Sequence, residues 1–269
     1  MSHRVVCLGA GNMAEALVSG WLDQGVVQAD ELCVSDPSQE RRERFSSRFG
    51  VAALEDNRAA VADAKVVVLA VKPQVLVQVL VEVRDAIRPE ACLISIAAGI
   101  RTATIEAHVH PGQSVIRVMP NTPALVGRGV SALARGQHAS EPDLLQAEQM
   151  MRAVGQTLRV DEGDMDAVTA VSGSGPAYLF GFTEGLIAAA IQAGLTPDQA
   201  CFLAVETVTG AAELMRVSGE PPDKLREKVT SKGGTTAAAL ASFEASGWQK
   251  IIAQAVEAAR QRSIELSAS

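Results

Sequence analysis

Short runs of hydrophobic residues alternate with longer mixed segments along the first part of the chain. The runs are almost continuously apolar, as expected for strands that helices cover on both faces, and the segments between them carry Asp, Glu and Arg. Strands that alternate with helices in this way form a parallel, doubly wound sheet. The predicted strands are Val5–Gly9, Leu32–Ser35, Val66–Val71, Leu93–Ala97 and Val115–Met119.

The pattern changes near Glu162, after which no strand-like run occurs. Apolar or small residues instead recur at helical spacing from Ala200 to Met215, and again from Trp248 to about Leu266. The sequence therefore predicts an α/β protein of two domains. Residues 1–162 form a Rossmann-like doubly wound sheet, and residues 163–269 form an all-helical domain.

The helical half is rich in Ala and Gly, which let helices approach closely but leave few bulky side chains for a self-contained core. Association of two copies would supply the missing burial. We therefore expect the helical domain to dimerise.

The composition narrows the possible functions. The 269 residues include 24 Lys or Arg against 31 Asp or Glu, a net charge of −7, and only 3% are aromatic. A nucleic-acid binder needs a basic surface or aromatic platforms for bases, so we expect no nucleic-acid partner. No apolar run approaches the roughly 18 residues of a membrane span, and no secretory signal pattern is visible, so we expect a cytoplasmic protein with no membrane partner.

Cysteine and histidine usage predicts no metal cofactor. Cys7, Cys33, Cys92 and Cys201 are scattered singly, which favours small buried side chains over disulfides or metal ligands. The four histidines lie outside every motif described below.

A glycine motif follows the first predicted strand. The segment from Gly9 to Ala14 has the form GxGxxA and lies between a strand and a helix. There the first glycine permits a tight turn, the second lets the backbone approach a pyrophosphate, and the alanine keeps the helix close to the strand. We assign Gly9, Gly11, Asn12 and Met13 to a dinucleotide; the alternative is a doubly wound fold without a cofactor.

The second predicted strand ends at Ser35-Asp36-Pro37, where the ribose of a dinucleotide is recognised. Asp36 by itself favours NAD, because a carboxylate binds the 2′-hydroxyl, unless Pro37 turns it away. Ser35 and the following arginines, Arg41, Arg42 and Arg44, favour the 2′-phosphate of NADP, although the arginines equally suit a solvated helix face. We predict NADPH and leave NADH open.

Further candidate residues follow the later strands, at the sheet edge where ligands collect. Asn57 can reach the adenosine, although it or Asp56 equally suits a helix cap. Lys72 can contact phosphate or nicotinamide, and equally can be a surface lysine. Asn121 offers amide donors in a loop that prolines hold rigid. The cofactor residues assigned after the first motif are Ser35, Asn57, Ala70, Lys72, Pro73, Ala98, Gly99 and Asn121.

Two motifs lie in the helical half, Ser172-Gly-Ser-Gly-Pro-Ala-Tyr178 and Val229-Thr-Ser-Lys-Gly-Gly-Thr-Thr236. In the second, two glycines and two threonines precede a helix-forming alanine run, which describes a helix N-terminus with outward-pointing amides. Such an N-terminus can bind a carboxylate or a phosphate. The alternative is a capped helix with no ligand.

Together these segments resemble the pyrroline-5-carboxylate reductase family over essentially the whole chain. The resemblance rests on GAGNMA, AVKP, SIAAG, MPNTPA, SGSGPAY and, most specifically, the stretch from Pro222-Asp-Lys-Leu through VTSKGGTTAAAL. One departure is visible, since Lys232 stands where many members carry Pro before the glycine pair. It leaves the implied reaction unchanged but puts the stiffness and charge of that loop in doubt.

The resemblance implies hydride transfer from NAD(P)H to the C=N carbon of 1-pyrroline-5-carboxylate, a cyclic imine carboxylate, which gives L-proline in the last step of its biosynthesis. It implies a homodimer and allows a larger ring of dimers. We assign Ser231 and the backbone of Gly234, Thr235 and Thr236 to the substrate carboxylate. The Thr236 hydroxyl is assigned to the imine nitrogen as the catalytic hydrogen-bond partner, and either Thr236 or water supplies the proton.

Two other functions fit the sequence less well. A β-hydroxyacid dehydrogenase would place a catalytic lysine after the glycine-rich turn at Ser172–Tyr178, and no lysine follows here. A non-enzymatic NADP sensor would not need the serine and threonines at 231–236. Tyr178, the only tyrosine, suits a general acid less well than a helix residue that lines or packs beneath the site.

Overall fold

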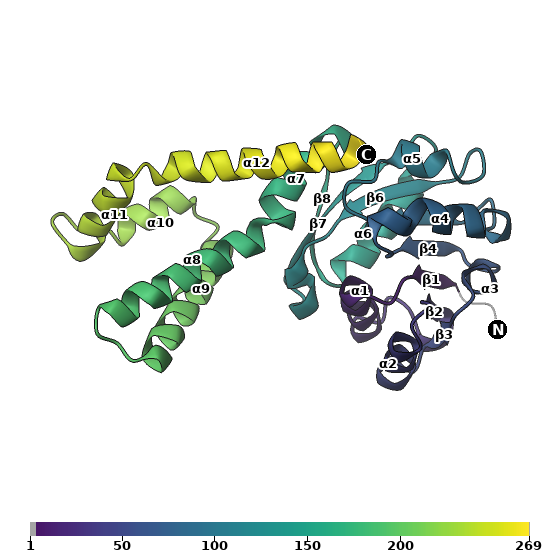
Figure 1. Cartoon of the computed structure of the whole chain (residues 1–269), viewed down its shortest axis with the longest axis horizontal. Helices are drawn as coiled ribbons and strands as arrows, with labels where there is room; N and C mark the ends of the chain where they lie inside the picture. The colour runs from purple at the N-terminus through teal and green to yellow at the C-terminus, as the bar shows by residue number, and fades with distance from the viewer. Residues whose placement is uncertain (1–3, 269) are drawn as a thin grey trace. The chain divides into compact units, whose positions relative to one another are not determined.

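The computed structural model describes residues 4–268, and its sheet and helices are drawn in Figure 1. One eight-stranded sheet has the order β3-β2-β1-β4-β5-β6-β7-β8. Its strands are β1 (Val5–Leu8), β2 (Leu32–Ser35), β3 (Ala52–Leu54), β4 (Val66–Leu69), β5 (Cys92–Ser95), β6 (Val115–Met119), β7 (Gly129–Arg135) and β8 (Gly155–Arg159).

Helices cover both faces of this sheet, as predicted. One hydrophobic cluster packs α1 (Asn12–Asp23), α2 (Gln39–Phe49) and α6 (Glu141–Arg152) on one face. A second packs α3 (Asn57–Val61), α4 (Pro73–Val83) and α5 (Thr102–Glu106) on the other. The prediction of a doubly wound α/β domain is confirmed.

The sheet is not wholly parallel, and the prediction missed three of its strands. Strands β3, β2, β1, β4, β5 and β6 are parallel, β7 pairs antiparallel with β6, and β8 pairs parallel with β7. The missed strands β3 and β8 lie at the two edges of the sheet. Edge strands are covered on fewer sides, so their sequences lack the continuous apolar run that identifies a central strand.

The rest of the described chain, to Ala268, is mainly helical, as predicted. After η4 (Glu162–Asp164) come α7 (Met165–Val168) and a π-helical turn at Thr169–Gly173, followed by five helices. Ser172–Tyr178 is therefore part of a helical stretch rather than the predicted turn. The helices are α8 (Gly175–Gln192), α9 (Pro197–Ser218), α10 (Pro222–Lys228), α11 (Thr235–Ala245) and α12 (Trp248–Ala268).

Contacts divide the described chain into two compact units. The first runs to Ser174 and includes the chain from Ala259 onward, and the second is Gly175–Ala258. Helix α12 therefore begins in the second unit and ends in the first. The predicted domain boundary after residue 162 stays a prediction, because this division follows packing alone.

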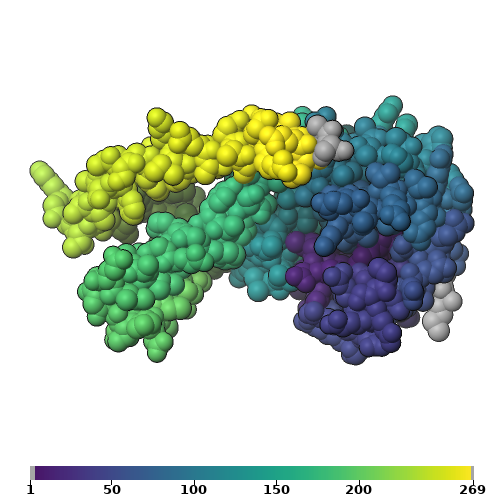
Figure 2. Space-filling model, viewed as in Figure 1, coloured from purple at the N-terminus to yellow at the C-terminus, as the bar shows by residue number. Residues whose placement is uncertain are grey.

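The second unit exposes large apolar side chains. Phe180 on α8 is 63% exposed, and Phe202 and Val217 on α9 are 66% and 68% exposed. The side chains of α8 form a surface of this unit in Figure 2, where they are green. Exposed large apolar side chains of this kind are typical of interaction surfaces.

Three of the four cysteines are buried, and the fourth corrects the prediction. Burial raises the pKa of the Cys33 thiol to about 11 and that of Cys92 to about 12, and it also raises the pKa of Cys7. These thiols stay protonated and unreactive. Cys201 is exposed instead, because α9 presents apolar residues to solvent in the single chain. No helix within residues 4–268 combines the length and apolar character that a membrane span needs.

Candidate active site

The glycine motif forms the turn between β1 and α1. Gly9 has a φ of +101°, and a Cβ atom placed on it would lie 2.6 Å from the carbonyl oxygen of Ala70. Only glycine therefore allows the turn after β1 to lie against the end of β4. From β1 the chain builds the sheet toward β2 and β3, and then returns to β4 on the other side of β1. This reversal is where doubly wound sheets bind ligands.

The N-terminus of α1 provides donors for an anion. Gly11 is the N-cap of α1, and no side chain caps this helix. The space where a Cβ of residue 11 would lie is open, with no atom within 4 Å. The first helical hydrogen bond is donated by Glu15 N to Gly11 O at 2.9 Å, which leaves the amides of Asn12, Met13 and Ala14 outside the helix ladder. These residues fit a pyrophosphate, because backbone donors and the helix dipole meet beside a position without a side chain.

The Asp36 carboxylate turns toward the glycine motif. Its Oδ2 accepts from Ala10 N at 2.9 Å and its Oδ1 from Ser38 N at 2.9 Å, and Asp36 is 4% exposed. The carboxylate thus ties the β1–α1 turn to the β2–α2 turn. Sequence reasoning considered Asp36 only as a ribose ligand and missed this contact between loops.

Ser35 and Asn57 hydrogen-bond to each other. Ser35 Oγ donates to Asn57 Oδ1 at 2.8 Å, and Asn57 Nδ2 donates to Glu82 Oε2 at 3.2 Å. The cap of α3 is Asp56, which accepts from Arg58 N and Ala59 N, so Asn57 is not the capping residue. The placement of Ser35 and Asn57 near an adenosine stays a prediction.

The three predicted arginines have different partners. Arg42 donates to the carbonyls of Asp36 and Pro37 at 2.8 and 2.9 Å, and Arg44 donates to Glu15 on α1 at 2.8 Å. Arg41 keeps 53% of its side chain exposed and lies 3.4 Å from Asp36 Oδ2. This contact with Asp36 is the longest of those that the three arginines make, while the side chain of Arg44 is about as exposed, at 57%.

The remaining predicted cofactor residues lie at the carboxyl ends of β4, β5 and β6. Ala70 N donates to Leu8 O at 2.8 Å, Lys72 is the exposed N-cap of α4, and Pro73 is its first residue. In the loop after β5, Ala98 is exposed, whereas Gly99 is buried with a φ of +77°.

The side-chain amide of Asn121 makes hydrogen bonds within the protein. Its Oδ1 accepts from Val130 N at 2.8 Å, and its Nδ2 lies 3.2 Å from Ser172 O and 3.3 Å from Ser172 Oγ. The side chain thus joins the loop after β6 to β7 and to the π-helical turn. The predicted amide contact to a nicotinamide stays a prediction, and Asn121 Nδ2 would have to share its hydrogens between Ser172 and that ligand.

The motif in the helical half forms the predicted helix N-terminus. Gly233 has a φ of +72°, Gly234 is the N-cap of α11, and no side chain caps the helix. Thr235 and Thr236 are the first two helical residues, and the first helical hydrogen bond is donated by Ala238 N to Gly234 O. The amides of Thr235, Thr236 and Ala237 are therefore available to an anion, whereas Gly234 N donates to Ser231 O at 3.1 Å.

Gly234 lies close to the side chain of Ser231. A Cβ atom at Gly234 would clash with Ser231 Oγ, so a larger residue there would displace this hydroxyl. Ser231 and Lys232 are exposed, and Thr236 is half-buried. The structure thus gathers Ser231, Gly234, Thr235 and Thr236 around one helix N-terminus.

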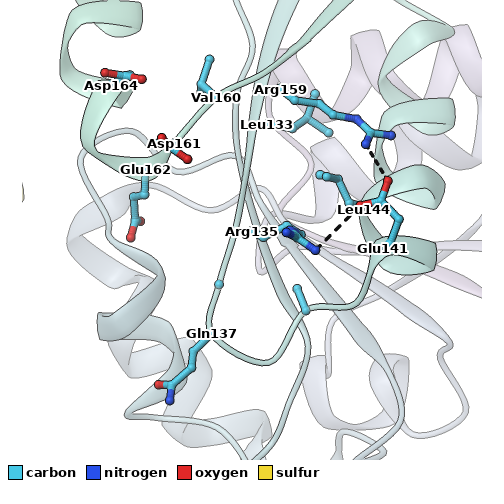
Figure 3. Close-up of a pocket in the computed structure, with 12 residues that line it drawn as sticks. Leu133, Arg135, Gln137, Glu141, Leu144, Arg159, Val160, Asp161, Glu162 and Asp164 are labelled. Carbon is cyan, nitrogen blue, oxygen red and sulfur yellow. Dashed lines mark hydrogen bonds and ion pairs between the residues drawn. The ribbon is translucent and has the colours of Figure 1, made fainter.

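A cavity of about 720 Å³ lies elsewhere, at the carboxyl ends of β7 and β8. Because β7 is antiparallel to β6, this edge is opposite to the one that carries the glycine motif. Figure 3 shows Arg135 and Arg159 both paired with Glu141 on one side, and Asp161, Glu162 and Asp164 on the other. Arg159 also donates to Glu148, and this lowers the pKa of the Glu148 carboxyl. The cationic groups of this cavity are thus neutralised by their neighbours.

Comparison with known proteins identifies the family. A family model for pyrroline-5-carboxylate reductase dimerisation matches residues 162–266, and one for NADP oxidoreductase, coenzyme F420-dependent, matches residues 4–99. The pyrroline-5-carboxylate reductase of Pseudomonas aeruginosa is 44% identical over 265 residues, which cover 98% of this chain and 97% of the relative. The chain belongs to the pyrroline-5-carboxylate reductase family. The resemblance inferred from the six motifs is confirmed.

Solved structures of the pyrroline-5-carboxylate reductase family have the same fold. The enzyme from Coxiella burnetii matches with a TM-score of 0.93 and 36% identity, over 99% of both chains. The Plasmodium falciparum pyrroline carboxylate reductase, solved with NADP bound, matches with a TM-score of 0.88 and 29% identity over 98% of both chains.

Proposed function

We propose that this chain reduces the C=N bond of 1-pyrroline-5-carboxylate to give L-proline, the last step of proline biosynthesis. A bound nicotinamide dinucleotide supplies the hydride, which goes to the imine carbon, while a proton goes to the nitrogen. The observation that carries the proposal is that a chain of this family has two uncapped helix N-termini, at Gly11 and at Gly234. One suits a pyrophosphate and the other suits the carboxylate of the imine.

The chain's own contribution is to bind and orient the two reactants. At the first N-terminus, Gly9 sets the turn and the amides of Asn12 and Met13 hold phosphate oxygens. At the second, Ser231 and the amides of Thr235 and Thr236 hold the substrate carboxylate. The Thr236 hydroxyl lies on the same turn and hydrogen-bonds to the ring nitrogen, where either it or water supplies the proton.

The test is the loss of absorbance at 340 nm when the protein is mixed with pyrroline-5-carboxylate and NADPH, and separately with NADH. Turnover with production of proline supports the reaction. A folded protein that binds NADPH but turns over neither mixture would contradict it and would favour the sensor interpretation.

NADPH is the proposed preferred cofactor. The Asp36 carboxylate is buried against Ala10 N and Ser38 N, which leaves it little capacity to bind the 2′-hydroxyl of NAD. Arg41 remains exposed beside the N-terminus of α2 and can pair with a 2′-phosphate.

Replacing Arg41 with alanine is expected to raise the KM for NADPH about 10-fold and to leave the KM for NADH nearly unchanged, because only NADPH carries the 2′-phosphate. The comparison variant is Arg44→Ala, whose guanidinium is held by Glu15 and which should change neither constant. Equal changes for both cofactors in Arg41→Ala would show that Arg41 does not recognise the 2′-phosphate.

We also propose a homodimer formed through the second unit, with a larger ring of dimers left as a prediction. The exposed apolar side chains of α8 and α9 support this, as does the match of residues 162–266 to the dimerisation family. The cytoplasmic location stays a prediction from the sequence.

Replacing Phe180 with aspartate is expected to convert the dimer to monomer at micromolar concentration, because a buried charge at an apolar interface is left unpaired. Light scattering after size exclusion measures the mass. Glu184→Gln on the same helix, at an exposed position, should leave the mass unchanged. An unaltered dimer in Phe180→Asp would place the interface elsewhere.

A further inference from the structure

Strand β6 carries a buried arginine. Its sequence is Val-Ile-Arg-Val-Met, and Arg117 at its centre is 4% exposed. A buried guanidinium is costly unless an anion lies beside it. Arg117 Nη1 donates to Glu162 Oε1 at 3.3 Å, and Glu162 opens the η4 turn that follows β8. A charged residue in an otherwise apolar strand is the sequence signal for such a partner.

The same carboxylate holds the first residue of α5. Thr102 N donates to Glu162 Oε1 at 2.7 Å, and Thr102 Oγ1 donates to Glu162 Oε2 at 2.8 Å. The N-cap of α5, Arg101, makes no side-chain cap. Glu162 therefore caps α5 from a distant part of the chain, with its negative charge at the positive end of the helix.

These contacts fix both ends of the loop formed by residues 96–101. At its start, Ile96 N donates to Leu69 O at 3.2 Å, and just past its end Thr102 is held by Glu162. Near the middle of the loop, Gly99 packs against Leu266 on α12: a Cβ atom placed on Gly99 would lie 3.5 Å from the Cβ of Leu266. Three parts of the chain thus hold a loop that carries two predicted cofactor residues, Ala98 and Gly99.

The end of α12 is hydrogen-bonded to Asp166, four residues after Glu162. Ser263 Oγ donates to Asp166 Oδ1 at 2.6 Å, and Ser263 is 5% exposed. Asp166 and Glu162 belong to the same short segment between β8 and the π-helical turn. That segment therefore restrains the loop directly through Thr102, and also through the helix that packs on Gly99.

We propose that Glu162 is a positioning residue of the cofactor site, which acts through Thr102 to hold the loop of residues 96–101 against the nicotinamide dinucleotide. The inference rests on the proposed function, because the loop matters to catalysis only if this sheet edge binds the cofactor. The carboxylate touches neither reactant. It sets the position of the α5 N-terminus, and Arg117 compensates its charge.

The experiment measures the Kd for NADPH by fluorescence titration, together with kcat and both KM values. Glu162→Gln keeps the size of the side chain but removes the charge, so Arg117 loses its partner and Thr102 loses one acceptor. We expect the Kd and KM for NADPH to rise about 10-fold or more, while kcat and the KM for the imine change much less. Asp164→Asn is the matched control, since Asp164 is an exposed carboxylate on the same turn, and it should leave the Kd unchanged.

A second pair of variants keeps the test decisive if Glu162→Gln fails to fold. Thr102→Val removes only the hydroxyl and should raise the Kd about 3-fold to 10-fold, and Thr102→Ser should restore it. Thr102→Val protein that binds NADPH as tightly as wild type would overturn the inference, as would a rise in Asp164→Asn equal to that in Glu162→Gln. Wild-type protein that binds no NADPH would overturn the proposed function as well, so the two failures are distinguishable.

Discussion

Replacing Gly11 with valine is expected to weaken NADPH binding by at least about 100-fold while leaving the fold intact. Gly11 has φ −83° and ψ 179°, an extended conformation that any residue adopts, and a Cβ there would meet no atom within 4 Å. The new side chain therefore strains nothing in the protein. It would fill the place beside the α1 amides that a pyrophosphate must approach, and a displacement of about 1 Å there is costly.

Fluorescence titration with NADPH and thermal unfolding together test this prediction. Gly25→Ala is the opposite case, because Gly25 has a φ of +65° with open space around it. That variant should lose about 1 kcal/mol of stability and no cofactor affinity. Gly11→Val protein with a wild-type Kd would show that the pyrophosphate does not lie at this N-terminus.

Replacing Thr236 with valine is expected to lower kcat about 10-fold to 1000-fold, the range for one oriented hydrogen bond that stabilises a transition state. Valine keeps the shape of threonine and removes the hydroxyl assigned to the ring nitrogen. The Kd for NADPH should not change, because the residue belongs to the substrate motif. The effect is limited because a cyclic imine can also take its proton from water.

Steady-state kinetics with two companion variants checks the assignment. Thr236→Ser retains the hydroxyl and should recover most of the rate. Thr235→Val changes the neighbouring, exposed threonine and should affect the KM for the imine more weakly, since only the backbone amide of Thr235 is assigned to the carboxylate. A normal kcat in Thr236→Val would remove Thr236 from the catalytic role.

The central strands were predictable from local sequence because burial on both faces requires an apolar side chain at nearly every position. Strands β2 (Leu32–Ser35) and β6 (Val115–Met119) have the predicted limits, and β1 and β4 each end within two residues of the predicted end. The edge strand Gly155–Arg159 was missed, because its alternate residues Thr157 and Arg159 bind Glu148 rather than entering a core. Polar pairing of this kind leaves no hydrophobic period to detect.

The candidate site was predictable where it depends on backbone. Gly9 could be identified because its positive φ and its close packing exclude a side chain, and Gly11 because a pyrophosphate at the α1 N-terminus would need the space of a side chain. Gly234 could be identified because it immediately precedes the alanine run that begins a helix. The partners of long polar side chains could not be identified in the same way. Arg44 pairs with Glu15, and Asn121 reaches Val130 and Ser172, contacts that depend on how separate elements meet.

The sequence by itself determined five of the eight strands and their alternation with helices, the glycine turn before α1, the uncapped start of α11 and the family. Each of these follows from residues adjacent in the chain, through hydrophobic period, backbone freedom or a run of motifs. Only the tertiary structure decided that Asp36 faces the glycine motif and that Glu162 caps α5. Both carboxylates have several possible partners in sequence, and burial selects among them, because a buried charge must take the donors that folding brings within reach.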